Sequence, residues 1–136
     1  MAPNPVAVLA LIRRLLDQVG RAGATAAAVA DAVGGDVVDS GAPLSVKARP
    51  RVPGVGAVTI TRRWESETPN SAVLELEPGL PPGLLEAEFG AATPVPGTGA
   101  APIMMLGDGD GPATVLVGLA DDGDVRSVTI RRERGP

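Results

Sequence analysis

Residues 113–132 read ATVLVGLADDGDVRSVTIRR, and this stretch decides the fold class. Apolar and β-branched residues fill both of its ends, and Asp122-Gly123 stands between them. An Asp-Gly pair between two β-rich runs is the strongest short-range signal for a hairpin, because the turn needs residues that tolerate positive φ. We therefore predict two antiparallel strands, with Val128 and Ile130 sharing one face of the second strand.

Four shorter segments upstream show the same strand character. Within residues 72–77, apolar Ala72, Leu74 and Leu76 alternate with outward residues, and a Pro-Gly turn follows. Together with the hairpin, the sequence predicts an antiparallel sheet of about six short strands. The four upstream segments span residues 44–49, 57–62, 72–77 and 103–106.

Helical periodicity appears in three places. Residues 5–21 carry one apolar stripe, with Asn4 as a candidate N-cap and Pro5 in the first turn. A second helical stretch starts at Thr25 and ends at a glycine pair, and a third opens at Leu80 and stops at a glycine. The chain is therefore expected to be one α+β domain, residues 1–136, with two or three helices on one face of the sheet.

The order helix, strand, strand, strand occurs twice. It defines candidate repeats at 24–79 and 80–135, preceded by the helix at 5–21. A shift of 56 residues lays Val29 on Leu85 and Ile60 on Leu116, so that inward positions are expected to fall on inward positions. Identical residues are few, and both an internal duplication and a coincidence within an α+β chain stay open.

The composition excludes several classes of function. The chain has no cysteine, no histidine and no tyrosine, and Lys47 is its one lysine. This removes thiol nucleophiles, thiolate metal sites, and the commonest general base and metal ligand. No phosphate-binding glycine loop or nucleophile elbow is present. We expect no enzyme, no cofactor and no metal.

Charge and hydropathy bear on partners and location. The net charge of −4 opposes nucleic-acid binding. No apolar run is long enough to cross a membrane, and Arg13 and Arg14 interrupt the one near the start, which also lacks the pattern of a signal peptide. A cytoplasmic location is expected. Heavy use of Ala, Gly, Val and Arg is typical of a GC-rich, bacterial genome.

Two segments resemble known families. The run LEAEFGAATPVP, which begins at Leu85, and the segment VGLADDGDVRSVTIRR, which ends at Arg132, are similar to the helix-plus-loop and hairpin of the BamE-like outer-membrane-assembly lipoproteins. They also resemble the β-lactamase-inhibitory proteins, which are built from two such units. The resemblance implies small antiparallel sheets with helices on one face, used to bind other proteins. The chain lacks the lipoprotein cysteine, the export signal and the disulfide of those families.

A cluster of arginines with one tryptophan is the candidate site. Arginine doublets stand at the ends of two predicted strands, and the tryptophan follows the first doublet. Tryptophan and arginine are enriched in binding hot spots. The alternative is that the arginines protect strand edges and the tryptophan caps the sheet. The predicted function is a non-catalytic protein-binding module of the inhibitor, immunity or adaptor type. Its predicted partner-binding residues are Arg62, Arg63, Trp64, Arg131 and Arg132.

A second hypothesis uses the aspartates of two turns. Asp108 and Asp110 lie in a GDGDG loop, and three more aspartates surround the hairpin turn. Alternating Asp and Gly resembles part of a calcium loop, although the remaining ligands of such a loop are missing. The alternative function is thus a small-ligand or metal-binding domain. Self-association through Met104, Met105 or an edge strand is a further expectation.

Overall fold

The two strands of the predicted hairpin lie in the second half of one large sheet. In the computed structural model, strand β7 (Ala113–Leu119) pairs with β8 (Val125–Arg132), and Gly123 has a φ of +86° in the turn. The predicted turn and both strands are confirmed. The structure describes residues 4–34, 36–38, 44–62, 68–95, 103–107 and 111–133.

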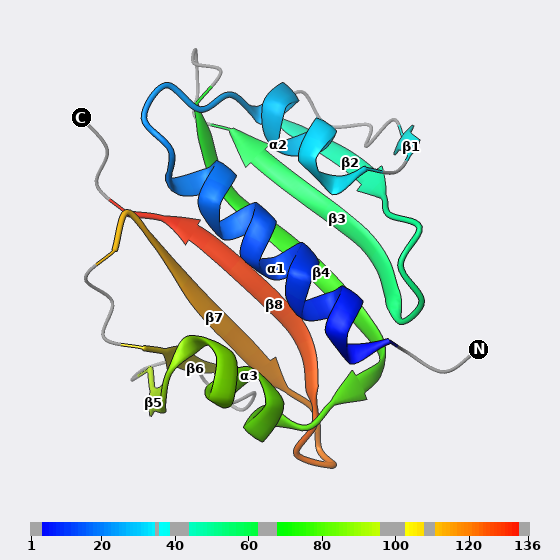
Figure 1. Cartoon of the computed structure of the whole chain (residues 1–136), viewed down its shortest axis with the longest axis vertical. Helices are drawn as coiled ribbons and strands as arrows, with labels where there is room; N and C mark the ends of the chain where they lie inside the picture. The colour runs from blue at the N-terminus through cyan, green and yellow to red at the C-terminus, as the bar shows by residue number, and fades with distance from the viewer. Residues whose placement is uncertain are drawn as a thin grey trace.

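The described strands form an eight-stranded antiparallel sheet with the order β1-β2-β3-β4-β8-β7-β6-β5 (Figure 1). Strands β4 and β8, which are far apart in the sequence, pair at its centre. The other strands are β1 (Asp36–Val38), β2 (Ser45–Arg49), β3 (Val55–Arg62), β4 (Pro69–Leu80), β5 (Ala92–Pro94) and β6 (Ile103–Leu106).

Three helices among the described residues match the three predicted stretches. They are α1 (Pro5–Gly20), α2 (Ala26–Val33) and α3 (Pro82–Phe89). The Asn4 carboxamide accepts a hydrogen bond from the backbone of α1, and Thr25 caps α2 in the same way. Leu80, predicted to open the third helix, is instead the buried last residue of β4.

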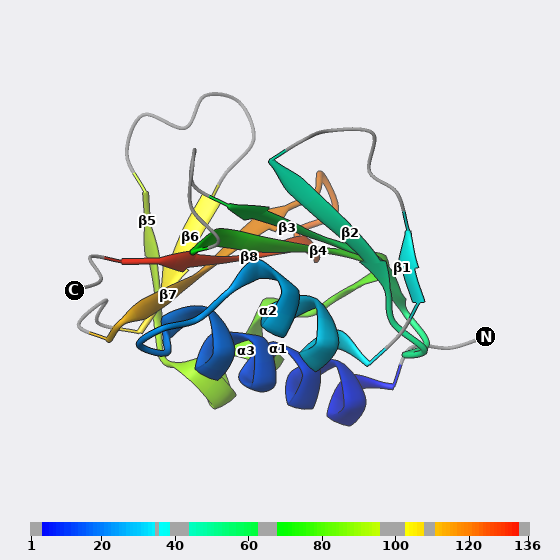
Figure 2. The same ribbon diagram turned by 90° about the horizontal axis from the view of Figure 1, so that it is seen from above.

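The helices lie in one layer on one face of the sheet (Figure 2). Helix α1 runs across β4, β8 and β7, α2 covers β2 and β3, and α3 lies beside β6. The core fills the space between the layers, and the α+β class with helices on one face is confirmed. The largest fully buried side chains of the core include Leu11, Ile12, Leu15, Ile60, Leu74, Leu85 and Ile130.

The sheet has eight described strands where the sequence predicted about six. The two that the sequence did not indicate, β1 and β5, are the edge strands, and each has three residues. Three residues are too few to show an alternating pattern, and Pro94 in β5 argues against a strand on propensity alone. These strands form because a neighbouring strand supplies the hydrogen-bonding partner.

The two halves of the sheet follow the proposed repeat. A shift of 56 residues carries the bounds of α2 onto those of α3 and the bounds of β1 onto those of β5. The middle strand, which is β3 in the first half and β7 in the second, departs from this shift. Ile60 pairs with Ala72, and the corresponding partner of Val128 is Val117, one residue beyond Leu116. Leu116 therefore faces away from the helices, and the prediction that it is an inward position is wrong. The duplication itself stays a prediction.

Among the described residues, no helix combines the length and the apolar character that crossing a membrane requires.

Candidate binding surface

The face of the sheet opposite the helices carries no second layer among the described residues (Figure 2). Because side chains alternate along a strand, every second residue of the central strands points to this side. Most of these residues are half-buried and are small, hydroxyl-bearing or apolar, whereas Glu75, Glu77 and Arg131 are charged and exposed. We call this surface the open face and define it by Thr59, Thr61, Ser71, Val73, Met105, Leu116, Ser127 and Thr129.

Strand pairing arranges the open face in rows that run across the sheet. The central part of the first row crosses five strands with Thr59, Val73, Thr129, Leu116 and Met105, and the pairing continues to Lys47 on β2 and Thr93 on β5. A second row places Thr61, Ser71 and Arg131 side by side. Neighbouring side chains in such rows are close enough to form one continuous surface.

The two ends of the open face differ in charge. At one end, Arg131 borders a hollow of about 310 Å³ that Asn70 and Ser71 also line. At the other end, Glu75 and Glu77 line a second hollow of about 320 Å³, together with Arg126. The open face is therefore a charge-poor surface with a basic end and an acidic end.

The open face shares its low number of charges with the cores of protein interfaces, whereas its serine and threonine side chains are ordinary for the outer side of an antiparallel sheet. A solvent-facing antiparallel sheet normally alternates apolar residues with polar and charged ones, whereas the cores of interfaces are depleted in charge and enriched in Met. Five strands span about 24 Å, and eight-residue strands such as β3 and β8 are about 26 Å long. The resulting area is of the order that each partner buries in a standard interface.

The structure places two of the five predicted binding residues, Arg62 and Arg131, near the basic end. Arg62 is opposite Pro69, two residues from the pairing of Ser71 with Arg131. Strand β4 alone separates β3 from β8, so the backbones of Arg62 and Arg131 are about 10 Å apart across the sheet. Arg63 and Trp64 lie outside the described residues.

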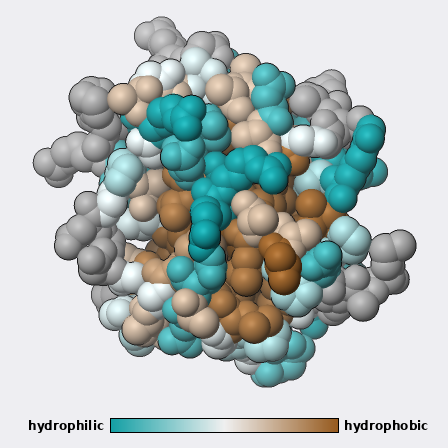
Figure 3. Space-filling model, in the orientation of Figure 1, coloured by the Kyte–Doolittle hydropathy of each residue, from teal (hydrophilic) through white to brown (hydrophobic). Residues whose placement is uncertain are grey.

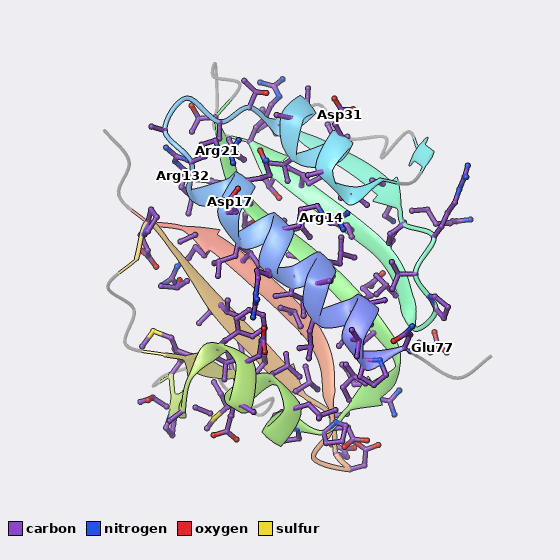
Figure 4. The ribbon with its side chains drawn as sticks, viewed as in Figure 1. Arg14, Asp17, Arg21, Asp31, Glu77 and Arg132 are labelled. Atoms are coloured by element: carbon purple, nitrogen blue, oxygen red, sulfur yellow. The ribbon has the colours of Figure 1, made fainter. Side chains whose placement is uncertain are left out.

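Arg132 also lines the hollow at the basic end, but its guanidinium is directed to the helix side of the sheet. Its guanidinium donates hydrogen bonds of 2.6 and 2.9 Å to the carbonyl oxygens of Val19 and Arg21. The last carbonyls of a helix have no partner within the helix, and a cation there also interacts favourably with the helix dipole. Figure 4 shows Arg132 beside Arg21 at the C-terminal end of α1. The geometry gives Arg132 a structural role, joining α1 to β8.

A carboxylate fixes the side chain of Arg131. One oxygen of Glu133 accepts hydrogen bonds from the Thr114 hydroxyl at 2.7 Å and from Nε and Nη2 of Arg131 at 3.1 and 2.9 Å. The Thr114 hydroxyl, and then the Arg131 guanidinium, hold the pKa of Glu133 below its ordinary value. We call these hydrogen bonds to Glu133 from Thr114 and Arg131 the Glu133 clasp. The clasp orders the Arg131 side chain, which remains exposed.

The aspartates of the hairpin turn stabilise that turn. One carboxylate oxygen of Asp122 accepts a hydrogen bond from the Asp124 backbone at 3.0 Å, and the other pairs with Arg126 at 3.2 Å. These contacts, the Asp124 amide first, lower the pKa of Asp122. Asp108 and Asp110 lie outside the described residues, and no group of three acidic residues within the described ranges is placed to hold a metal.

Sequence reasoning identified the basic end and missed the open face. The alternation that places Thr59 and Thr61 outward was recognisable, but it did not reveal that no described residues cover this side. The sequence feature that could have indicated the open face is the type of residue at the outward positions of the strands. Outward positions such as Thr59, Ser71 and Thr129 hold short hydroxyl side chains, so this side carries few charges.

Comparison with known proteins shows a similarity in fold. No family model matches the chain, and no curated protein matches its sequence. The crystal structure of YjgB, a DUF4309 family protein from Bacillus subtilis, is similar with a TM-score of 0.57 and 12% sequence identity. The match covers 92% of this chain and 97% of that chain. At this identity, the likeness concerns the fold alone.

This finding corrects the resemblance noted in the sequence. The likeness to YjgB extends over almost the whole chain, whereas the similarity to BamE-like and β-lactamase-inhibitory proteins rested on two short segments. A helix that stops at Gly90 and an Asp-Gly hairpin are local solutions to backbone geometry. Such motifs recur in unrelated α+β proteins, so they do not identify a family.

Proposed function

We propose that this chain is a non-catalytic protein-binding module that uses the open face as its interface. The observation that carries the proposal is the chemistry of that face: half-buried hydroxyl and apolar side chains extend across five central strands with no covering layer among the described residues. Charge-poor surfaces of this size are the kind that associating proteins bury.

The charges at the two ends define the partner's chemistry. A partner that fits both would present a carboxylate opposite Arg131 and a cation opposite Glu75 and Glu77. Glu133 holds the Arg131 guanidinium in place, so a partner's carboxylate meets a donor that is already ordered. The occupant we propose is a folded protein with a mostly uncharged contact surface that carries these two opposite charges.

The test compares capture by the tagged chain and by three variants. Thr129→Arg places a long cation in the middle of the open face, and Arg131→Glu reverses its basic end. Ala87→Arg adds the same charge as Thr129→Arg on the exposed side of α3 and serves as the matched control. A protein captured in stoichiometric amounts is then purified and titrated against each variant.

We expect Thr129→Arg to weaken binding at least tenfold, while Ala87→Arg binds like the wild type. Charge reversal at Arg131 should weaken binding, and a partner variant with the opposing carboxylate changed to Lys should restore it. Trp64→Ala in the same titration tests the predicted hot spot. Equal binding by wild type and Thr129→Arg, or an empty capture from folded bait, would contradict the proposal.

A further inference from the structure

The exposed side of α1 carries a stripe that the proposed interface does not use. Its residues follow one another at intervals of four, three, four and three, so they lie on one face of the helix. Val6 begins the stripe with 77% of its surface exposed, the largest exposure among the described large apolar residues. We call this surface the α1 stripe and define it by Val6, Ala10, Arg13, Asp17 and Gly20.

The α1 stripe is complementary to itself. Arg13 and Asp17 are equidistant from Leu15 and carry opposite charges, and Ala10 and Gly20 are equidistant from the same residue and are both small. Two copies of α1 crossing antiparallel about a two-fold axis at Leu15 would place each Arg13 against the other copy's Asp17. Ala10 is small and exposed and allows a close approach of the second copy, whereas the side-chain position of Gly20 faces Pro112 and Ala113 of the same chain.

Two hollows flank the α1 stripe, and both are lined by Arg13 and Asp17. The larger, about 530 Å³, also includes Val6, and the smaller, about 390 Å³, lies beside Gly20 and Pro112. In the antiparallel crossing, Val6 of one copy lies beyond the last turn of the other copy's α1, beside that smaller hollow. Figure 3 shows hydrophilic side chains along the path of α1 with apolar patches beside them.

The Arg13 guanidinium and the Asp17 carboxylate can each make further hydrogen bonds beyond those within the chain. Arg13 pairs with Glu88 of α3 through one nitrogen, and Asp17 pairs with Arg21 through one oxygen at 2.5 Å. The side chain of Arg13 is 64% exposed, and so is that of Asp17. A guanidinium has five N–H donors and a carboxylate about four acceptor sites, so each can take a second partner.

We propose that a second copy of this chain docks on the α1 stripe and forms an antiparallel two-fold dimer with reciprocal Arg13–Asp17 ion pairs. Such contacts are isologous, the commonest symmetry among homo-oligomers. One helix face on each copy makes a small interface. The dimer is therefore weak and forms at high micromolar concentration. It leaves the open face, on the other side of the sheet, available for a different protein.

The experiment is a charge swap followed by sedimentation over a concentration series. Arg13→Asp gives every copy two acidic groups on the α1 stripe, and Asp17→Arg gives every copy two cations, so each single variant should be monomeric at all concentrations. An equimolar mixture of the two pairs opposite charges again. We expect the mixture, and the double variant Arg13→Asp/Asp17→Arg, to regain the wild-type association constant to within about threefold.

Asp31→Arg is the matched control, because it makes the same change at an exposed position of α2. This variant and Thr129→Arg should dimerise like the wild type, which separates the α1 stripe from the open face. Circular dichroism establishes that each variant is folded. The proposal is overturned by a wild type that stays monomeric to millimolar concentration, or by folded single variants whose mixture does not associate.

Discussion

Helices α2 and α3 occupy equivalent places in the two halves of the sheet, yet they are held very differently. Each has eight residues. Helix α2 begins after its N-cap Thr25, and α3 begins after its N-cap Pro81. Helix α2 buries four side chains, Ala26, Val29, Ala30 and Val33, whereas α3 buries Leu85. Leu84 of α3 remains 39% exposed.

The difference shows that matching element bounds do not imply matching stability. Small alanines on α2 let it lie close to α1, β2 and β3, while α3 meets α1 through the Arg13–Glu88 ion pair and reaches β6 through its C-terminal end. An exposed ion pair adds little stability. Helix α3 therefore has one fully buried side chain, supported by the partly buried Phe89 and by a hydrogen bond from the Ala92 amide to the Glu86 carboxylate, and it is the region expected to open first.

The largest effect is expected from Leu85→Ala. The side chain is fully buried, and truncating such a leucine costs about 2–5 kcal/mol. Hydrogen exchange should accelerate throughout 82–89 while α2 stays protected. Val29→Ala, at the equivalent position of α2, should leave its helix protected because three further side chains anchor it. Equal loss of protection in both helices would remove the contrast.

The glycines that end the two helices should differ next. Gly34, with φ +77° and ψ 13°, is in the αL conformation, where alanine costs about 1–2 kcal/mol. Gly90, with φ +113° and ψ 168°, is in a region that essentially only glycine adopts. A Cβ at Gly90 would also lie 2.7 Å from the Cα of Gly107, whereas one at Gly34 would meet nothing closer than 3.9 Å. We expect Gly90→Ala to cost more in urea denaturation than Gly34→Ala. The reverse order would refute the close approach of α3 to β6.

The N-caps provide a smaller test. The Thr25 hydroxyl accepts a hydrogen bond from the Ala28 amide at 3.1 Å, and Pro81 has no side-chain group for that purpose. Replacing a hydroxyl N-cap by alanine costs about 1 kcal/mol. Thr25→Ala should lower the melting temperature measurably, while Pro81→Ala changes it less. A larger loss at Pro81 would show that its rigid backbone, rather than capping, positions α3.

The smallest effect concerns pH and the Glu133 clasp at the end of β8. Folding lowers the pKa of Glu133 from its ordinary value of 4.5, so its contribution is present above that value. The contribution is lost as pH falls through the folded pKa. Between pH 5 and pH 3, wild-type stability should decrease more than that of Glu133→Gln. Parallel curves for the two proteins would show that the clasp adds nothing to folding.

Much of the fold was readable because the signals are local. The Asp122-Gly123 turn, the Asn4 cap and the alternation in 72–77 each depend on residues close together in the chain, and each appears where predicted. The face of Leu116 was mispredicted because a one-residue difference between the halves reverses a strand, and only pairing partners reveal it.

The sequence by itself determined the three helices, six of the eight described strands, the α+β class and the function classes that its missing histidine and cysteine exclude. The tertiary structure alone decided that β4 pairs with β8, that Arg131 and Arg132 point to opposite sides, and that no described residues form a layer over one face of the sheet. Turns and caps are set by neighbouring residues, whereas strand order and the covering of a face arise from contacts between residues far apart in the chain. A single sequence carries no local record of those contacts.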